Sequence, residues 1–140
     1  FQRKYGSEIV HMLRPTNNHT YPEGSDVTFP EFVKYLILKA QMQDTSEFNP
    51  HWRPYHRLCH PCLVNYDFIG KFETFQYDSK IILYQLTRSI PRRVTSRFID
   101  KKKATTANVF HEFFKHVSKE DTAAAFRMYQ KDFELYDYMI

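Results

Sequence analysis

Residues 63–83 read LVNYDFIGKFETFQYDSKIIL, and the expected fold class depends on this stretch. Its first part, residues 63–72, is rich in aromatic and β-branched side chains with partial alternation, which predicts a largely buried strand. Thr74 is placed to cap a helix that follows. A strand followed by a helix is half of a βαβ unit, so the sequence predicts an α/β fold. The apolar face of that helix would consist of Phe75, Ile82, Leu83 and Leu86.

The clearest helix begins at residue 28. Thr28 and Glu31 have the spacing of a capping box, in which two side chains satisfy amides at the helix start. Pro30 lies in the first turn, where its missing N–H does no harm. The apolar side chains recur with helical spacing and predict a face turned to the core: Phe29, Phe32, Val33, Leu36 and Ile37.

Two further helices are expected at the end of the chain, over residues 106–117 and 119–136. Ser118 and Asp121 form the capping pair of the second. Most of the regular structure in these residues is therefore expected to be helical. The predicted apolar faces are Val109, Phe110, Phe113, Phe114 and Val117 in the first helix, and Ala125, Phe126, Tyr129, Phe133 and Tyr136 in the second.

Composition indicates one folded domain. The 140 residues are 42% hydrophobic and 17% aromatic, which is enough for a substantial core. Only 3 glycines occur, so neither familiar glycine-rich phosphate loop can be written anywhere. No apolar run approaches the ~18–20 residues that span a bilayer. Because the chain opens at FQRKYGSEIV without Met, we expect it to be part of a longer protein.

Positive charge is concentrated in one place. The segment Arg88–Lys103 has a net charge of +6, although the whole chain carries +4. This segment predicts an anionic partner, and a solvated loop that keeps the protein soluble is the alternative. Its seven cations are Arg88, Arg92, Arg93, Arg97, Lys101, Lys102 and Lys103, against the single acid Asp100.

Residues 48–62, FNPHWRPYHRLCHPC, form the most unusual segment. A zinc site at Cys59 and Cys62 would need two nearby histidines, but structural zinc sites usually join two separated ligand pairs. A thioredoxin-type C-x-x-C should begin a helix after a strand, whereas this one precedes the expected strand. The segment thus remains a metal site, a redox site, a catalytic loop or a covalently linked connector. The histidines concerned are His51, His56 and His60.

The same segment, together with the stretch after it, resembles the C-terminal half of the Golgi carbohydrate sulfotransferases. That family includes the chondroitin and dermatan 4-O-sulfotransferases, the N-acetylgalactosamine 4-sulfotransferases and the natural-killer-epitope sulfotransferase. The helix VTFPEFVKYL and the ending YQKDFELYDY are similar to the family's phrases as well. The matching positions are Asn49, His51, Trp52, Leu58, Cys59, Pro61, Cys62, Tyr66, Asp67, Gly70, Lys71, Phe72, Glu73 and Thr74.

The resemblance implies an enzyme that transfers a sulfuryl group from 3′-phosphoadenosine 5′-phosphosulfate (PAPS) to a glycan hydroxyl. The 4-hydroxyl of N-acetylgalactosamine in chondroitin or dermatan is the expected acceptor. It also implies a type II Golgi membrane protein with a lumenal catalytic domain, anchored by a segment not found here. Residues 1–140 would be the C-terminal portion of one α/β parallel-sheet domain related to P-loop kinases. Both PAPS-binding segments would precede residue 1, so we expect no activity from these residues alone.

The resemblance also implies roles for residues of segment 48–62. In an oxidising lumen, Cys59 and Cys62 are expected to be disulfide-bonded, to each other or to a cysteine elsewhere, with two buried free thiols as the alternative. His51 is a candidate for the base that deprotonates the acceptor hydroxyl, with structural packing as the alternative. Trp52 would stack on a sugar or fill the core. Arg53 and Arg57 would pair with glycan carboxylates, or would simply be exposed loop residues.

Three further expectations concern the rest of the chain. Asn18 begins the sequon Asn-His-Thr in a polar loop, which predicts N-glycosylation. In the basic segment, Arg92, Arg93 and Lys101–Lys103 would bind the glycan or the 3′-phosphate of PAPS. Lys71, Glu73 and Thr74 are expected to be structural, and no metal is expected.

A second class of function competes with the enzyme. The basic segment and the many aromatic residues would also suit a non-catalytic module that binds nucleic acid or an acidic glycan. Against it, most aromatic residues fall on helical apolar faces, and no RNA-binding or zinc-finger spacing appears. The sequence therefore favours a carbohydrate sulfotransferase with a glycan partner and no nucleic acid.

Overall fold

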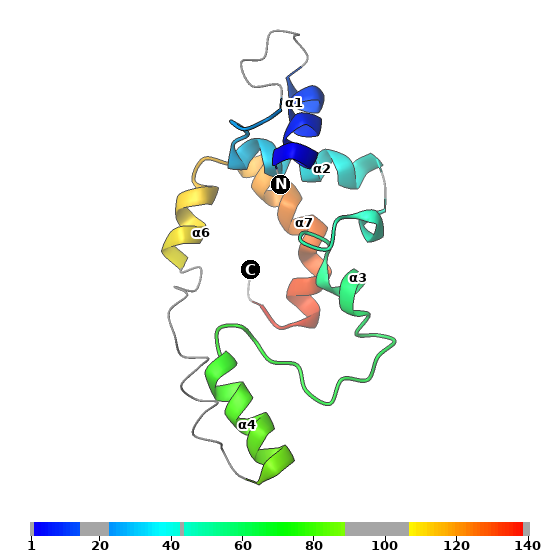
Figure 1. The fold of residues 1–140 in the computed structure, drawn as a ribbon, viewed down its shortest axis with the longest axis vertical. Coiled ribbons are helices and arrows are strands. Elements are labelled where there is room, and N and C mark those ends of the chain that lie inside the picture. Colours follow the sequence, from blue (N-terminus) through cyan, green and yellow to red (C-terminus); the bar gives the residue numbers. More distant parts are fainter. Residues whose placement is uncertain (1, 15–22, 43, 89–106, 139–140) are drawn as a thin grey trace. The chain divides into compact units, whose positions relative to one another are not determined.

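The computed structural model of the chain describes residues 2–14, 23–42, 44–88 and 107–138 (Figure 1). In this part of the chain every regular element is a helix. Contacts divide the chain into a first unit, Phe1–His60 with Thr105–Ile140, and a second unit, Pro61–Ala104. The elements are η1 (Gln2–Gly6), α1 (Ser7–Leu13), α2 (Phe29–Met42), η2 (Thr45–Glu47), α3 (Tyr55–Cys59), α4 (Phe75–Thr87), α6 (Ala107–Phe114) and α7 (Lys119–Leu135).

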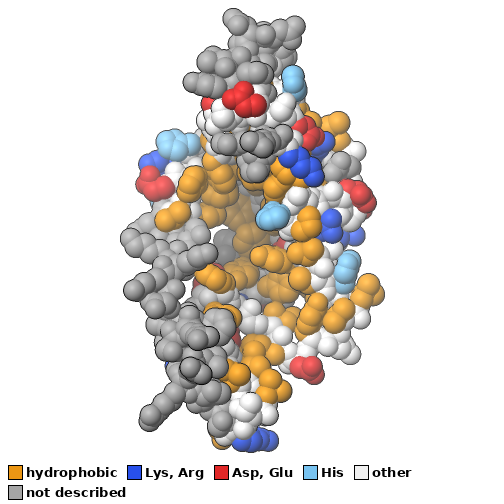
Figure 2. Space-filling model, in the orientation of Figure 1, with side chains coloured by type: hydrophobic (Ala, Val, Ile, Leu, Met, Phe, Trp, Pro, Cys, Tyr) orange, Lys and Arg blue, Asp and Glu red, His pale blue; other side chains and the backbone are white. Residues whose placement is uncertain are grey.

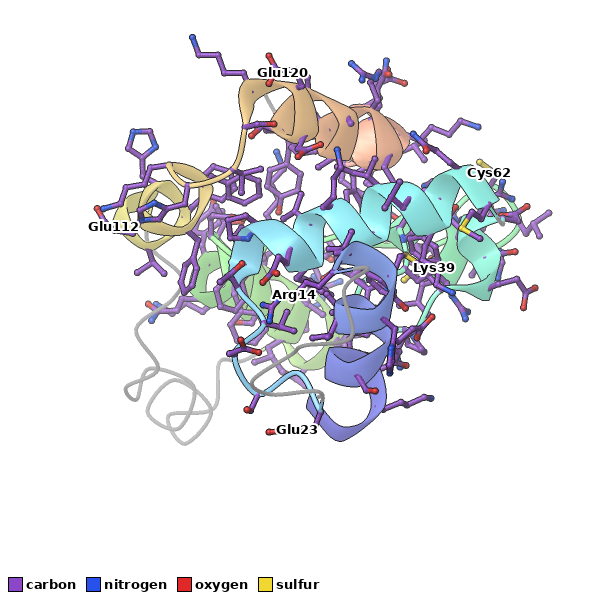
Figure 3. All side chains as sticks on the ribbon, turned by 90° about the horizontal axis from the view of Figure 1, so that it is seen from above. Arg14, Glu23, Lys39, Cys62, Glu112 and Glu120 are labelled. Carbon is purple, nitrogen blue, oxygen red and sulfur yellow. The ribbon has the colours of Figure 1, made fainter. Side chains whose placement is uncertain are left out.

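Helix α2 is the centre of the first unit, and its predicted start is confirmed. Glu31 Oε2 accepts from Thr28 N at 2.9 Å and from Thr28 Oγ1 at 2.8 Å, and Thr28 Oγ1 accepts from Glu31 N at 3.4 Å. Val33, Leu36 and Ile37 of the predicted apolar face are buried. Because this helix buries side chains on more than one side, α1 and α7 pack on either side of it (Figure 3).

Charged side chains join α1 to α2. Arg14, directly after α1, donates from Nε and Nη2 to Glu31 at 2.7 and 2.9 Å, and from Nη1 to Asp26 at 2.8 Å. The bonds from Arg14, and then those from Thr28, lower the pKa of Glu31 from its ordinary 4.5 to about 2. The bonds from Arg14 to Glu31, and then the bond to Asp26, raise the pKa of Arg14 further above its ordinary value. Glu31 thus both caps α2 and holds the end of α1.

A second polar contact between these helices is centred on Glu8. Tyr35 Oη donates to Glu8 Oε2 at 3.0 Å, and Lys39 Nζ lies 2.7 Å from Glu8 Oε1. Burial, and then the bond to this carboxylate, raises the pKa of Tyr35 above its ordinary value. Tyr35 was not part of the predicted apolar face, yet it is buried in the core with Ile9 and Phe48.

Helix α7 covers the other side of α2. Its predicted cap is confirmed, since Ser118 Oγ accepts from Asp121 N at 3.0 Å. The carboxylate of Asp121 does not return the bond but pairs with Lys34 of α2 at 2.9 Å. Val117 is buried against Val33 and Ile37, so the turn before α7 belongs to the core.

Helix α6 is shorter than predicted, and its apolar face is only partly buried. Phe114 packs on Phe29 with ring centroids 5.2 Å apart, but Phe110 and Phe113 remain 45% and 53% exposed. The amphipathic pattern therefore identified the helix correctly and overestimated its burial. Among the described helices, none has both the length and the apolar character needed to cross a bilayer.

The second unit corrects the prediction that defined the fold class. Residues 63–72 form turns, bends and irregular backbone, and Leu63 and Phe72 are 84% and 69% exposed. A strand needs a neighbour to accept and donate its backbone hydrogen bonds, and no strand occurs within the described residues. The predicted strand is therefore wrong for this structure, and the α/β sheet is not shown by these residues.

The helix after this stretch forms as predicted, but its cap does not. Thr74 precedes α4 without bonding an amide, and its hydroxyl donates to Asp78 Oδ2 at 2.5 Å. Asp78 Oδ2 also accepts from Lys71 N at 3.1 Å, so the acid of the first turn organises the junction. No residue of α4 is buried, and Phe75 and Leu86 of the predicted face are exposed.

Candidate functional site

The segment Phe48–His60 belongs to the first unit, and hydrogen bonds of its own backbone form its turns. Phe48 is buried in the core, and Asn49 O accepts from both Trp52 N and Arg53 N at 3.0 Å. Pro54 is fully buried and precedes the short helix α3. The prolines thus stiffen a connector whose turns present successive side chains in different directions.

Arg53 is used within this connector. Its Nε and Nη2 both donate to Phe48 O, at 2.9 and 2.7 Å. A guanidinium bonded in this way stabilises the turn, and the predicted pairing of Arg53 with glycan carboxylates remains a prediction. Arg57 is exposed on helix α3 rather than in a loop, with Nη2 3.7 Å from Asp44 Oδ1.

Trp52 lies between aromatic rings. Its ring meets Tyr5 edge-on at 4.6 Å and Phe32 edge-on at 5.4 Å, and it is partly buried against the core. The backbone carbonyl of Trp52 accepts from Tyr129 Oη at 2.6 Å. Burial, and then the charge of Asp132, raises the pKa of Tyr129 to about 12, so the hydroxyl stays a donor at neutral pH.

Asp132 is the site residue that the sequence analysis missed. It is 7% exposed, and its carboxylate accepts from Tyr55 N at 2.6 Å, from His56 N at 2.8 Å and bonds His56 Nδ1 at 2.7 Å. The carboxylate satisfies amides at the start of α3, where a helix terminus favours negative charge. A charged residue inside the amphipathic pattern of α7 was the only available signal.

His51 is exposed and has an ordered set of polar partners. Its backbone N–H donates to Asn49 Oδ1 at 3.0 Å, and its ring nitrogen Nδ1 lies 2.7 Å from the same oxygen. Asn49 Nδ2 donates in turn to Tyr5 Oη at 2.6 Å. One imidazole nitrogen is therefore engaged by the protein, and the ring is oriented although it is exposed.

Two cavities share His51 and Trp52 as lining residues, and both cavities lie in the first unit. One, of about 320 Å³, is lined mostly by side chains of α2, α6 and α7; the other, of about 520 Å³, reaches Tyr5 and Asn49. Figure 2 shows hydrophobic side chains beside a hollow near the centre of the view. The residues that line both cavities are Phe29, Phe32, His51 and Trp52.

Neither Cys59 nor Cys62 lines either cavity. No disulfide joins Cys59 and Cys62, so the structure does not show the predicted bond. Within the ranges that the structure describes, no three His, Cys, Asp or Glu side chains form a group that could bind a metal. The predictions for Asn18, for Arg92 and Arg93, and for Lys101–Lys103 fall outside the described residues.

Comparison with known proteins assigns the family. The profile of the sulfotransferase family matches residues 1–139. Carbohydrate sulfotransferase 11 from Mus musculus is 34% identical over 141 residues, an alignment that covers 100% of this chain and 39% of the relative. The chain therefore belongs to the sulfotransferase family, and the predicted resemblance is confirmed. It spans about two fifths of the length of that relative.

Two other relatives support the same family assignment. Carbohydrate sulfotransferase 14 from Homo sapiens is 42% identical over 83 residues, which covers 59% of this chain and 21% of the relative. Carbohydrate sulfotransferase 12 from Mus musculus is 33% identical over 148 residues, which covers 99% of this chain and 33% of the relative. No solved structure matches the chain. The relatives identified by name are thus carbohydrate sulfotransferases of three kinds.

Proposed function

We propose that this chain is part of a PAPS-dependent carbohydrate O-sulfotransferase and supplies the acceptor side of its site. The observation that carries the proposal is a match over residues 1–139 to the sulfotransferase family, together with an oriented histidine between two aromatic-lined cavities. Its domain would be the C-terminal portion of an α/β sulfotransferase fold. The protein would work in the Golgi lumen, held by an anchor outside these residues, on chondroitin, dermatan or a related glycan.

The two cavities suit a sugar better than the donor. Phosphosulfate and 3′-phosphate groups need cations or several N–H donors, whereas these walls are largely aromatic and aliphatic. Arg53 is the lining cation of the smaller cavity, and its guanidinium is already bonded to Phe48 O. Aromatic faces and edges fit the C–H surfaces of a sugar ring, and Trp52 supplies the largest of them. We therefore assign no PAPS contact to these cavities.

His51 would act as the base of the reaction. The acceptor oxygen forms a bond to sulfur while the bond from sulfur to the donor phosphate breaks, and the hydroxyl proton must leave. A neutral imidazole accepts such a proton at near-neutral pH. Because His51 lines both cavities and is held by Asn49, it is the described side chain best placed for this role.

The competing function, a non-catalytic basic module, is not favoured. Relatives with sulfotransferase names align with 100% and 99% of the chain, including the segment that carries His51. The basic segment 88–103 is then best explained as part of the same enzyme. We propose that it binds the acceptor polyanion or the 3′-phosphate of PAPS.

The test uses the protein at its natural length, expressed in a secretory host. Labelled PAPS and desulfated chondroitin or dermatan should give labelled glycan, and His51→Gln should lower kcat by about 10²–10⁴-fold, the usual contribution of a general base. His116→Gln, at an exposed histidine outside both cavities, is the matched control and should leave kcat unchanged. Trp52→Phe should raise the acceptor KM and spare the PAPS KM. No turnover with any glycan would refute the function, and full activity of His51→Gln would refute the role of His51.

A further inference from the structure

The hydrogen bonds around His51 determine which of its ring nitrogens carries the proton. We infer that Asn49 is a positioning residue that holds neutral His51 as the Nδ1–H tautomer, leaving Nε2 as the basic nitrogen. The inference rests on three bonds, from His51 N and His51 Nδ1 to Asn49 Oδ1 and from Asn49 Nδ2 to Tyr5 Oη. As a statement about catalysis, it rests also on the proposed function.

The partners of the Asn49 side-chain amide determine its orientation. A side-chain amide offers an oxygen that accepts and a nitrogen that donates, and the two ends are told apart by their partners. A backbone N–H can only donate, so the atom 3.0 Å from His51 N must be the oxygen. The other end then faces Tyr5 Oη at 2.6 Å, where a hydroxyl oxygen accepts from the amide nitrogen.

The orientation of Asn49 in turn determines which ring nitrogen of His51 carries the proton. Asn49 Oδ1 has no hydrogen, so the bond of 2.7 Å to His51 Nδ1 requires the proton to be on Nδ1. A neutral imidazole carries one proton, and Nε2 must therefore hold the lone pair. Without such a partner, the tautomer with the proton on Nε2 is the more populated form of neutral histidine in water. Asn49 thus reverses the ordinary preference of an exposed ring.

The consequence concerns the direction of proton transfer. A base with its lone pair on Nε2 accepts the proton at the ring edge farthest from the backbone, and Nδ1–H remains bonded to Asn49 when the ring becomes positively charged. The asparagine oxygen also stabilises that charge, because a bond to an ionised donor is stronger than a neutral one. The arrangement resembles in principle the acid that orients a catalytic histidine, with a neutral amide in its place.

The tautomer can be measured without activity. Histidine labelled with ¹⁵N in the protein gives distinct chemical shifts for protonated and unprotonated ring nitrogens, recorded at about pH 9, well above the ordinary histidine pKa of ~6.5. His51 should show a protonated Nδ1 in the unaltered protein, and His116 serves as an internal exposed reference. His51 with its proton on Nε2 would overturn the inference. This measurement uses the unaltered protein, so it does not depend on whether a variant folds.

Variants distinguish a role of Asn49 in positioning His51 from a purely structural role. Asn49→Ala should move His51 toward the Nε2–H tautomer and lower kcat about tenfold, with little change in either KM. Asn49→Asp keeps an acceptor oxygen and should keep the Nδ1–H tautomer and most of the activity. Tyr5→Phe removes the hydroxyl but keeps the ring, and should leave the tautomer unchanged, since the His51 amide still orients Asn49. An unchanged tautomer in Asn49→Ala would refute the inference.

The outcomes distinguish the inference from the proposed function. If His51 is the Nδ1–H tautomer but His51→Gln keeps full activity, Asn49 positions the ring and the catalytic role of His51 is wrong. If His51→Gln is inactive but Asn49→Ala keeps both the tautomer and kcat, the base stands and the role of Asn49 is wrong.

Discussion

Glu31 carries two structural duties, and its loss should destabilise the first unit measurably. Its carboxylate caps α2 through Thr28 and accepts two hydrogen bonds from the guanidinium of Arg14 at the end of α1. Glu31→Gln keeps the size of the side chain and one acceptor oxygen, and it removes the charge. The substitution therefore tests the ion pair and the strong cap while leaving the packing of α2 intact.

The magnitude follows from the pKa of Glu31. A decrease from 4.5 to about 2 corresponds to about 3 kcal/mol, at ~1.4 kcal/mol for each pKa unit. The side chain is 24% exposed, and solvent screens the interaction, so we expect about 2 kcal/mol. Because the folded pKa lies below the ordinary one, this stabilisation is complete above pH 4.5 and is lost as the pH falls toward about 2.

The assay is urea unfolding followed by tryptophan fluorescence. Trp52 is the chain's one tryptophan and lies in the first unit, so the signal reports this unit. At neutral pH, Glu31→Gln should lose about 2 kcal/mol, whereas Glu134→Gln, at an exposed residue of α7, should lose less than ~0.5. The difference between Glu31→Gln and the unaltered protein should shrink steadily below pH 4.5. A cost under ~0.5 kcal/mol, or one that does not depend on pH, would refute the reasoning.

Four further predictions concern other parts of the chain. Asp132→Asn should cost about 2–3 kcal/mol in urea unfolding, because an amide cannot replace a buried carboxylate that accepts three bonds; a loss below ~0.5 would contradict this. Cys59 and Cys62 should be oxidised in protein from a secretory host, and two freely alkylated thiols in mass spectrometry without reduction would show otherwise. Neutralising Lys101–Lys103 should raise the acceptor KM several-fold and weaken its salt dependence if the segment binds glycan, whereas a rise in the PAPS KM alone would place it on the donor. Asn18 should carry a glycan removable by an amidase, and unmodified peptide from a secretory host would count against the loop assignment.

Local sequence signals predicted where helices α2 and α7 begin, whereas α1 and α3 were not predicted. The start of α2 follows from Thr28 and Glu31, and the start of α7 from Ser118, because capping depends on residues only three positions apart. Burial of Val33 follows from helical periodicity in the same way. These features are set by neighbours in the chain, so a single sequence contains the information they need.

Features that depend on distant partners were not predicted. Residues 63–72 have the composition of a strand, but a strand forms only against another strand, and composition cannot supply one. The Thr74 cap is a different kind of miss, because its hydroxyl donates to Asp78, only four positions along the chain. The histidine and tryptophan of the site were identified through a family resemblance, whereas Asn49 was recognised only as part of that phrase. Its bond to Tyr5 joins side chains 44 positions apart, which no local pattern reveals.

The site also changes how the closing helix should be understood. Tyr129 and Asp132 are one helical turn apart on α7, and both bond the connector 77 residues earlier, at Trp52 O and Tyr55 N. One bond fixes the backbone immediately after His51, and the other fixes the start of α3, so α7 holds the connector on both sides of Pro54. The connector is exposed at His51 and has no sheet beside it in the described residues, and its geometry depends on these two side chains. A sequence phrase near the end of the chain, YQKDF, therefore belongs to the same site as NPHW, although neither phrase predicts the other.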